Sequence, residues 1–223
     1  MLVDLNLNGK QVIIIGGGTE GLRKLRGLED QNCEIILITN RLNKVIKSLQ
    51  ERGKLSLRKE YVKDTSFLKD YRNPFLVLAC TNNKLLNRAI VKEASLMGAL
   101  SYAVDDPSVS GFSYASIINI EGILQIAIST SGRSPIVARR FRIKAERVLR
   151  RLINKSDIEN IRLQEAARRM IRTKIPTVSE RKEFLYSIIN NAAIQKLIKE
   201  DRIDDARQEL VALINSWEGK GTK

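Results

Sequence analysis

The stretch QVIIIGGGTEGLRKLRGL, residues 11–28, decides the fold of this 223-residue chain. Its four branched apolar residues at 12–15 predict a strand that is buried on both faces. Gly16, Gly18 and Gly21 follow as G-x-G-x-x-G, and leucines at helical spacing come directly after them. A second apolar run at 33–38 predicts the next strand and completes a βαβ unit. In that context the glycine pattern indicates a dinucleotide site.

Each glycine of the pattern has a physical reason. Gly16 permits a tight turn, Gly18 lets the backbone approach a pyrophosphate, and Gly21 lets the helix pack on the strand. The pyrophosphate is expected on the free N–H groups at the start of the helix, where the helix dipole favours an anion. We therefore expect Gly16, Gly17 and Gly18 to contact the cofactor.

The residues after the second strand bear on which dinucleotide binds. A carboxylate that accepts hydrogen bonds from the adenosine ribose is expected roughly 20 residues after the glycines. Here Thr39, Asn40 and Arg41 follow the strand instead. Asn40 is able to bond a ribose hydroxyl, and Arg41 is able to accommodate a 2′-phosphate. The sequence predicts a dinucleotide and leaves the choice between NAD and NADP open.

Composition excludes several classes of protein. The chain is 43% hydrophobic and holds no histidine and only two cysteines, which excludes histidine chemistry and a zinc site. Cys33 and Cys80 lie in or beside apolar strands and are expected to be buried thiols in a reducing compartment. No apolar run approaches the length of a membrane span, and the first ten residues lack a signal peptide. We expect a cytoplasmic protein without a membrane partner.

The net charge of +14 is unevenly distributed. Residues 133–174 hold 14 basic and 4 acidic side chains, so +10 of the net charge lies in one segment. Such a segment usually faces a polyanion, a nucleic acid or an acidic membrane. Phe141 is its one aromatic residue, and no helix-turn-helix pattern occurs, so we expect no nucleic acid partner.

Strands and helices alternate along the first half of the chain. Further strands are predicted at 55–59, 75–80 and 100–104, and helices at 41–52 and 83–98. This alternation predicts an α/β fold with a Rossmann-like, doubly wound parallel sheet. Because ligands bind beyond the carboxyl ends of such strands, Thr81 is expected beside the cofactor.

The second half of the chain is predicted to be mainly helical. One more apolar strand is predicted at 123–129, followed by helices at 135–153, 156–173, 178–199 and 203–216, with Pro176 as an interruption. Ser134 and Pro135 are typical of a helix start. The turn at 130–132 just before them is rich in hydroxyls and glycine and is suited to an anion. The sequence predicts a small all-helical C-terminal domain.

Four motifs, in this order, resemble precorrin-2 dehydrogenase, the sirohaem synthase module that oxidises precorrin-2 to sirohydrochlorin. They are GGGTEGLRK at 16–24, ACTNNKLLN at 79–87, YAVDDPSVSGF at 102–112 and AISTSGRSPIVARRFR at 127–142. The resemblance covers about residues 3–150, and the helical tail matches in kind and length. One departure is Ile120, which stands where the family has an arginine.

The resemblance implies an NAD-dependent dehydrogenase that forms a homodimer. Its parts would be an NAD-binding Rossmann domain at 1–113, a dimerisation and substrate-binding segment at 114–150, and a helical C-terminal domain at 151–223. Its cofactor contacts would include Thr19 and Glu20 after the glycines, together with Asn40 and Arg41.

The resemblance also implies a catalytic residue and a substrate. Asp105 matches the family's catalytic aspartate, although spacing alone favours a turn-forming aspartate before Pro107. Precorrin-2 carries eight carboxylates, which gives the basic segment a ligand. The expected substrate-binding residues are Ser129, Thr130, Ser134, Arg139 and Arg140. Thr130 also matches a serine that can be phosphorylated in multifunctional relatives.

Two other functions stay open at this point. Some members of the family also insert Fe²⁺ into sirohydrochlorin, and the same aspartate would then serve as a base for the metal step. A nucleotide-sensing regulatory module is the alternative from a different class. The sequence identifies neither the downstream tetrapyrrole pathway nor the modification state of Thr130.

Overall fold

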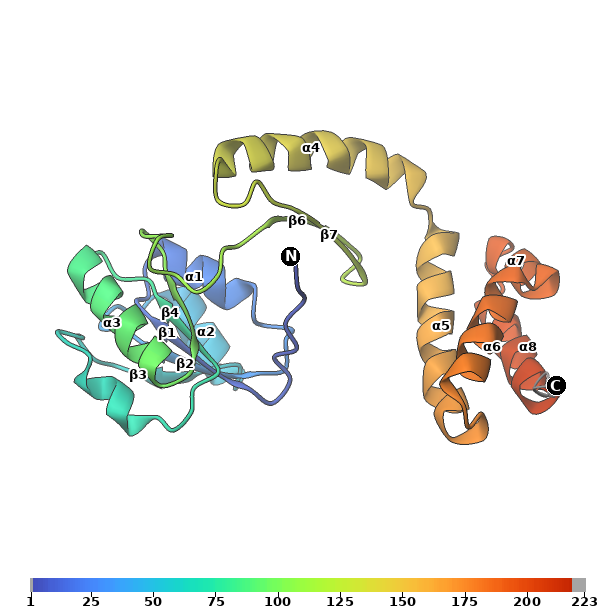
Figure 1. The fold of residues 1–223 in the computed structure, drawn as a ribbon, viewed down its shortest axis with the longest axis horizontal. Helices are drawn as coiled ribbons and strands as arrows, with labels where there is room; N and C mark the ends of the chain where they lie inside the picture. The colour runs from blue at the N-terminus through green and yellow to red at the C-terminus, as the bar shows by residue number, and fades with distance from the viewer. Residues whose placement is uncertain (1, 218–223) are drawn as a thin grey trace. The chain divides into compact units, whose positions relative to one another are not determined.

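The computed structural model describes residues 2–217, which fall into two compact units (Figure 1). The first unit runs to Ala115 and also includes Ser129–Ser134. The second unit comprises Ser116–Ile128 and the residues from Pro135 onward. Within residues 2–217, no helix is both long enough and apolar enough to cross a membrane.

The first unit is built on a five-stranded parallel sheet. Its strands are β1 (Gln11–Ile15), β2 (Glu34–Ile38), β3 (Ser56–Arg58), β4 (Leu76–Ala79) and β5 (Leu100–Ala103). They lie in the order β3-β2-β1-β4-β5, so the predicted Rossmann-like sheet is confirmed. The order reverses between β1 and β4, and a sheet of this kind binds its ligand beyond the carboxyl ends of these strands.

Helices cover both faces of this sheet, as Figure 1 shows for the first unit. The helices are α1 (Thr19–Arg26) and α2 (Lys44–Glu51) on one face, and α3 (Lys84–Leu96) with the 3₁₀ turn η1 (Ser66–Asp70) on the other. Val12 and Ile14 face α1 and α2, whereas Ile13 and Ile15 face α3. Because both faces are buried, β1 reads as a continuous apolar run.

The second unit begins with an antiparallel hairpin. Strand β6 (Ser116–Ile120) pairs with β7 (Leu124–Ile128), and helix α4 (Pro135–Leu152) packs against both. The predicted strand at 123–129 corresponds to β7, and α4 begins at Pro135 as expected. The sequence did not predict β6 as a strand. Glu121 and Gly122 connect the two strands at φ values of +53° and +71°.

Four helices complete the second unit: α5 (Lys155–Lys174), α6 (Val178–Asn190), α7 (Ala192–Lys199) and α8 (Ile203–Asn215). The prediction of one helix over 178–199 is wrong, because the chain is extended at Asn191 with φ −75° and ψ 110°. The Oδ1 of Asn191 accepts a hydrogen bond of 3.0 Å from the N–H of Ile194. Asn191 therefore ends one helix and caps the next.

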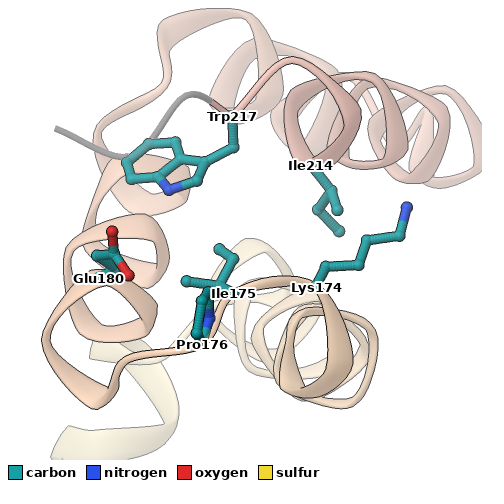
Figure 2. Close-up of a pocket in the computed structure, with 6 residues that line it drawn as sticks. All are labelled: Lys174, Ile175, Pro176, Glu180, Ile214 and Trp217. Carbon is teal, nitrogen blue, oxygen red and sulfur yellow. The ribbon is translucent and has the colours of Figure 1, made fainter. Parts of the chain in front are cut away.

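Pro176 separates α5 from α6, as the sequence predicts, and a small hollow lies beside it. Figure 2 shows this hollow between the α5–α6 connection, α6 and the end of α8. Its lining residues are Lys174, Ile175, Pro176, Glu180, Ile214 and Trp217. The ring of Trp217 packs edge-on against that of Phe184 with 4.9 Å between the centroids. Trp217 is thus partly buried and packs against the core of the helical bundle.

Candidate functional site

The glycine loop lies at the carboxyl end of β1, next to the end of β4. Gly16 has a φ of +108°, a conformation that L residues rarely adopt, and a Cβ there would overlap the carbonyl oxygen of Cys80. A Cβ at Gly21 would overlap the carbonyl oxygen of Gly16. The protein's own backbone therefore requires glycine at 16 and at 21.

Gly18 differs from these glycines because the space around it is open. A Cβ at this position would meet nothing within 4 Å, and its φ of −76° suits any residue. Gly18 is the N-cap of α1 and supplies no side chain to the N–H groups of Thr19 and Glu20. These N–H groups, together with the helix dipole, are suited to an anion such as a pyrophosphate. The loop fits the dinucleotide that its sequence predicts.

Thr39 lies beneath this loop and is only 4% exposed. Its Oγ1 accepts hydrogen bonds of 3.1 Å from the backbone N–H groups of Gly17 and of Arg41. The side chain therefore fastens the glycine loop to the end of β2. Asn40 and Arg41 are exposed beyond it. The structure brings all four of these residues together at the carboxyl edge of the sheet.

Asp105 follows β5 and is tied to the end of β4 by a buried asparagine. The Nδ2 of Asn87, on α3, donates to Asp105 Oδ1 at 2.8 Å and to the carbonyl oxygen of Thr81 at 3.0 Å. The other carboxylate oxygen, Asp105 Oδ2, is buried and has no hydrogen-bond partner within residues 2–217. Leaving a buried polar atom unpaired is costly, so this oxygen is suited to a proton or a ligand.

Asp106 supplies the turn that spacing alone would have assigned to Asp105. Its Oδ1 accepts hydrogen bonds from the N–H of Ser108 at 3.0 Å and from the Ser108 hydroxyl at 2.5 Å. Its Oδ2 pairs with Arg88 at 2.6 Å. The hydrogen bonds from Ser108, and then the one from Arg88, hold the pKa of Asp106 below its ordinary value. Asp106 therefore uses both of its oxygens in the turn, whereas Asp105 Oδ2 has no hydrogen-bond partner among residues 2–217.

A buried lysine lies on the opposite face of the sheet from α3. Lys24 is 6% exposed, and its Nζ lies 3.1 Å from the ring centroid of Tyr114 and 4.3 Å from that of Tyr102. Burial, and then the charge of Arg23, lower the pKa of Lys24 to about 8. The two rings stabilise the ammonium by cation–π contacts where water cannot.

The chain has two cysteines, and both are free thiols. Cys80 is buried at the end of β4, and burial raises the pKa of its thiol to about 12. Cys33 is half-buried, and burial likewise raises its pKa. Both thiols stay protonated near neutral pH and are poor nucleophiles. Among the described residues, no three His, Cys, Asp or Glu side chains come together as a metal site.

The hydroxyl-rich turn at 129–134 belongs to the first unit, as Asp105 does. The Oγ1 of Thr130 accepts a 3.0 Å hydrogen bond from the N–H of Ser134, and the Oγ of Ser129 accepts one of 3.0 Å from the N–H of Ser131. Three of the predicted substrate residues, Ser129, Thr130 and Ser134, therefore lie in one turn directly before α4.

Arg139 and Arg140 lie on α4, in the second unit, and both are exposed. The same helix exposes large apolar side chains, namely Ile136, Phe141, Val148 and Leu152. A shallow hollow on this helix is lined by Val137, Arg140, Phe141 and Lys144. One helix thus combines basic side chains with an uncovered apolar surface.

Comparison with known proteins agrees with the geometry of the glycine loop. The family model described as "Putative NAD(P)-binding" matches residues 3–116, which is the region of the parallel sheet. The chain belongs to this NAD(P)-binding family. A second model, described as the central part of a sirohaem biosynthesis protein, matches residues 121–144, which include β7 and the first half of α4. The NAD(P)-binding family and the open loop at Gly18 both indicate a nicotinamide dinucleotide as cofactor.

Relatives of this NAD(P)-binding chain extend the comparison. The siroheme synthase of Actinobacillus succinogenes is 31% identical over 206 residues, which cover 92% of this chain and 41% of that protein. The siroheme synthase of Mannheimia succiniciproducens is 30% identical over 217 residues, or 96% of this chain and 43% of that protein. The chain spans about two fifths of the length of these relatives.

Among solved structures, SirC, a precorrin-2 dehydrogenase, is similar to this NAD(P)-binding chain with a TM-score of 0.67 and 20% sequence identity. The match covers 97% of this chain and all of the other. At this level of identity the likeness concerns the fold, and it extends through the helical C-terminal part.

Sequence reasoning missed two residues of this site. Asn87 follows leucines on a helix that was expected only to cover the sheet, and Lys24 belongs to a run of basic residues that resembles a solvated face. The helical period was a usable signal for both. Lys24 is three residues after the buried Gly21 and Asn87 is three residues before the buried Ile90, so each lies on the face of its helix that meets the sheet.

Proposed function

We propose that this protein catalyses the NAD-dependent dehydrogenation of precorrin-2 to sirohydrochlorin, a step of sirohaem biosynthesis. The observation that carries the proposal is Asp105, whose carboxylate lies at the edge of the sheet where the dinucleotide loop also lies. One oxygen of Asp105 is held by Asn87 and the other is buried without a partner among residues 2–217. The similarity to siroheme synthases over most of the chain supports the choice of substrate.

The reaction removes two hydrogens from the substrate. A nicotinamide dinucleotide held at the glycine loop would supply the acceptor for one of them, as hydride. The other leaves as a proton, and Asp105 Oδ2 is the group that takes it and later releases it to water. The hydrogen bond from Asn87 holds the carboxylate of Asp105 in a fixed position, and a fixed position is a large part of what a catalytic base contributes.

Each predicted cofactor residue has a role in this proposal. The N–H groups of Gly18, Thr19 and Glu20 would hold the pyrophosphate, and Asn40 and Arg41 would face the adenosine ribose. Gly16 and Gly17 give the loop its shape, and Thr39 fastens it. Thr81 joins the end of β4 to Asn87 and thereby to Asp105.

The substrate is a polyanion, and basic side chains are needed to hold it. We assign this task to Arg139 and Arg140 of α4, together with the hydroxyls of Ser129, Thr130 and Ser134. Charge-assisted contacts between arginine and carboxylate are worth roughly 1.5–3 kcal/mol each when partly desolvated, and much less at an exposed rim.

A homodimer and a cytoplasmic location complete the proposal. The apolar side chains exposed on α4 favour a second copy of the chain as the partner of this helix. In this proposal residues 1–113 bind NAD, residues 114–150 form the dimer and contact the substrate, and helices α5 to α8 form a separate helical domain. We propose neither nucleic acid nor a membrane as a partner.

The direct experiment is to mix the purified protein with precorrin-2 and NAD without oxygen. The proposal requires one NADH for each sirohydrochlorin formed, which is read from the absorption of both products. A parallel reaction with NADP tests the role of Arg41, because the ribose carboxylate that usually excludes NADP is missing. Absence of NADH and of sirohydrochlorin with intact protein would refute the proposal.

A further inference from the structure

Asn87 is a polar residue in an apolar place. It lies on α3 between side chains that pack against the sheet, and it is 0% exposed. Neighbours on the same face, such as Leu86 and Ile90, belong to the hydrophobic core. A buried amide has to be fully hydrogen-bonded to be tolerated, so its partners define its function.

The amide of Asn87 uses all of its hydrogen-bonding capacity. Its Oδ1 accepts from the N–H of Thr81 at 3.1 Å and from the Thr81 hydroxyl at 2.7 Å. Its Nδ2 donates to the carbonyl oxygen of Thr81 at 3.0 Å and to Asp105 Oδ1 at 2.8 Å. An asparagine amide has two donor hydrogens and two acceptor lone pairs, and all four are used here. This network also fixes which end of the amide faces Asp105.

We propose that Asn87 is a positioning residue for Asp105: it occupies Oδ1 and leaves Oδ2 as the oxygen that accepts the substrate proton. This inference rests on the proposed function. Three of the four hydrogen bonds of Asn87 go to Thr81, and these three would be sufficient to hold the chain in place where it leaves β4. The fourth bond serves Asp105 alone, and it is the feature that a purely structural asparagine would not need.

The variant Asn87→Asp tests this inference because it keeps the shape of the side chain. It replaces the Nδ2 donor by a second carboxylate oxygen that faces Asp105 Oδ1. Two carboxylates in contact retain a proton between them to higher pH than either would alone. We expect the acidic limb of the kcat–pH profile to move up by at least one pH unit, while the KM for NAD stays within about twofold.

The charge-matched control is Asn83→Asp on the same helix. Asn83 caps α3 by accepting a 3.1 Å hydrogen bond from the N–H of Leu86, and aspartate caps equally well. We expect this variant to keep the wild-type pH profile. A second readout, free of substrate and cofactor, is the ¹³C resonance of the Asp105 carboxyl during a pH titration. It should move to higher pH in Asn87→Asp and stay in place in Asn83→Asp.

An unchanged kcat–pH profile and carboxyl titration in a folded Asn87→Asp protein would overturn the inference. If that variant does not fold, Asn87→Ser serves instead. It is expected to lower kcat at least tenfold with little change in either KM, and an unchanged kcat would equally overturn the inference. Failure of the proposed function is recognised separately, because the carboxyl titration needs no precorrin-2 and reports on Asn87 whatever the substrate is.

Discussion

The glycines at 16, 18 and 21 share a motif, but they are required for different reasons. Gly16 and Gly21 are fixed by the protein itself, since a Cβ at either position would overlap a backbone carbonyl oxygen. Gly18 has open space around it, so only a bound ligand requires glycine there. The sequence motif alone does not show which glycines are required by the fold and which by a ligand. That difference depends on which backbone atoms lie next to each glycine in the folded protein.

The variant Gly18→Val is therefore expected to fold normally and to lose NAD. Its side chain would occupy the space in front of α1 where the pyrophosphate is expected, and we predict at least a tenfold loss of NAD affinity by calorimetric titration. Gly21→Ala is the contrasting variant, because its Cβ would overlap Gly16 and lower the thermal stability of the protein. Unchanged NAD affinity in a folded Gly18→Val protein would contradict the assigned pyrophosphate site.

Lys24 predicts a dependence of stability on pH. Burial lowers its pKa to about 8 in the folded protein, against 10.5 in the unfolded chain. Between these values the unfolded chain binds more protons, so the free energy of unfolding rises as the pH rises from about 8 to 10.5. Below pH 8 the folded protein holds the buried ammonium at its full cost, about 3 kcal/mol for a shift of this size.

The variant Lys24→Met removes this titration. Denaturation of both proteins from pH 7 to 10.5 should show wild type gaining stability relative to Lys24→Met as the pH rises. Groups that titrate in both proteins, including Tyr102 and Cys80, largely cancel in the difference. A difference that stays constant over this range would show that Lys24 keeps an ordinary pKa.

At the scale of helices and strands, the hydrophobic pattern predicted the parallel sheet well because β1, β2 and β4 are short apolar runs between turn residues. The hydrophobic pattern was less informative about where helices begin and end, because these positions depend on single capping side chains. Asn43 starts α2 at Lys44 rather than at residue 41, since its Oδ1 accepts from the N–H of Ile46 at 3.0 Å. Asn191 divides a region that is apolar at helical spacing throughout.

The cap at Asn191 is testable by Asn191→Ala. Loss of its hydrogen bond to Ile194 should destabilise the helical part by about 1 kcal/mol, the usual cost of removing an N-cap. Trp217, the single tryptophan of the chain, packs against the core of this bundle, so its fluorescence reports the unfolding of this part alone. Asn191→Ser, which keeps a cap, should have nearly wild-type stability. Equal stability of the alanine and serine variants would contradict the capping role.

At the scale of the whole molecule, the fold and the kind of cofactor could be predicted from sequence, but the hydrogen bonds that organise the site could not. Asp105 and Asp106 are adjacent in sequence, and only their hydrogen bonds distinguish them: Asp106 holds the turn, whereas Asp105 Oδ2 has no hydrogen-bond partner within the described part of the chain. The network from Thr81 through Asn87 to Asp105 joins residues that are 24 positions apart. Contacts of this kind depend on the tertiary fold rather than on local pattern.

The apolar surface of α4 predicts a dimer. Light scattering of the wild-type protein at micromolar concentration should give twice the mass of the chain. The double variant Phe141→Glu, Val148→Glu places charges on the exposed apolar surface of α4 and should shift the protein towards monomer without loss of NAD binding. A wild-type monomer that retains dehydrogenase activity would contradict this prediction.

The central claim is that Asp105, and not Asp106, accepts the substrate proton at the edge of the NAD-binding sheet. The most direct measurement compares Asp105→Ala with Asp106→Ala in single-turnover formation of NADH from precorrin-2 and NAD. We predict that Asp105→Ala lowers the rate by about 10²-fold or more with NAD affinity unchanged, a typical loss for a general base. Asp106→Ala should lower it far less, because its carboxylate serves the turn through Ser108 and Arg88. Near-normal turnover in the Asp105→Ala protein would contradict the account. Loss of turnover in Asp106→Ala while Asp105→Ala remains active would contradict it as well.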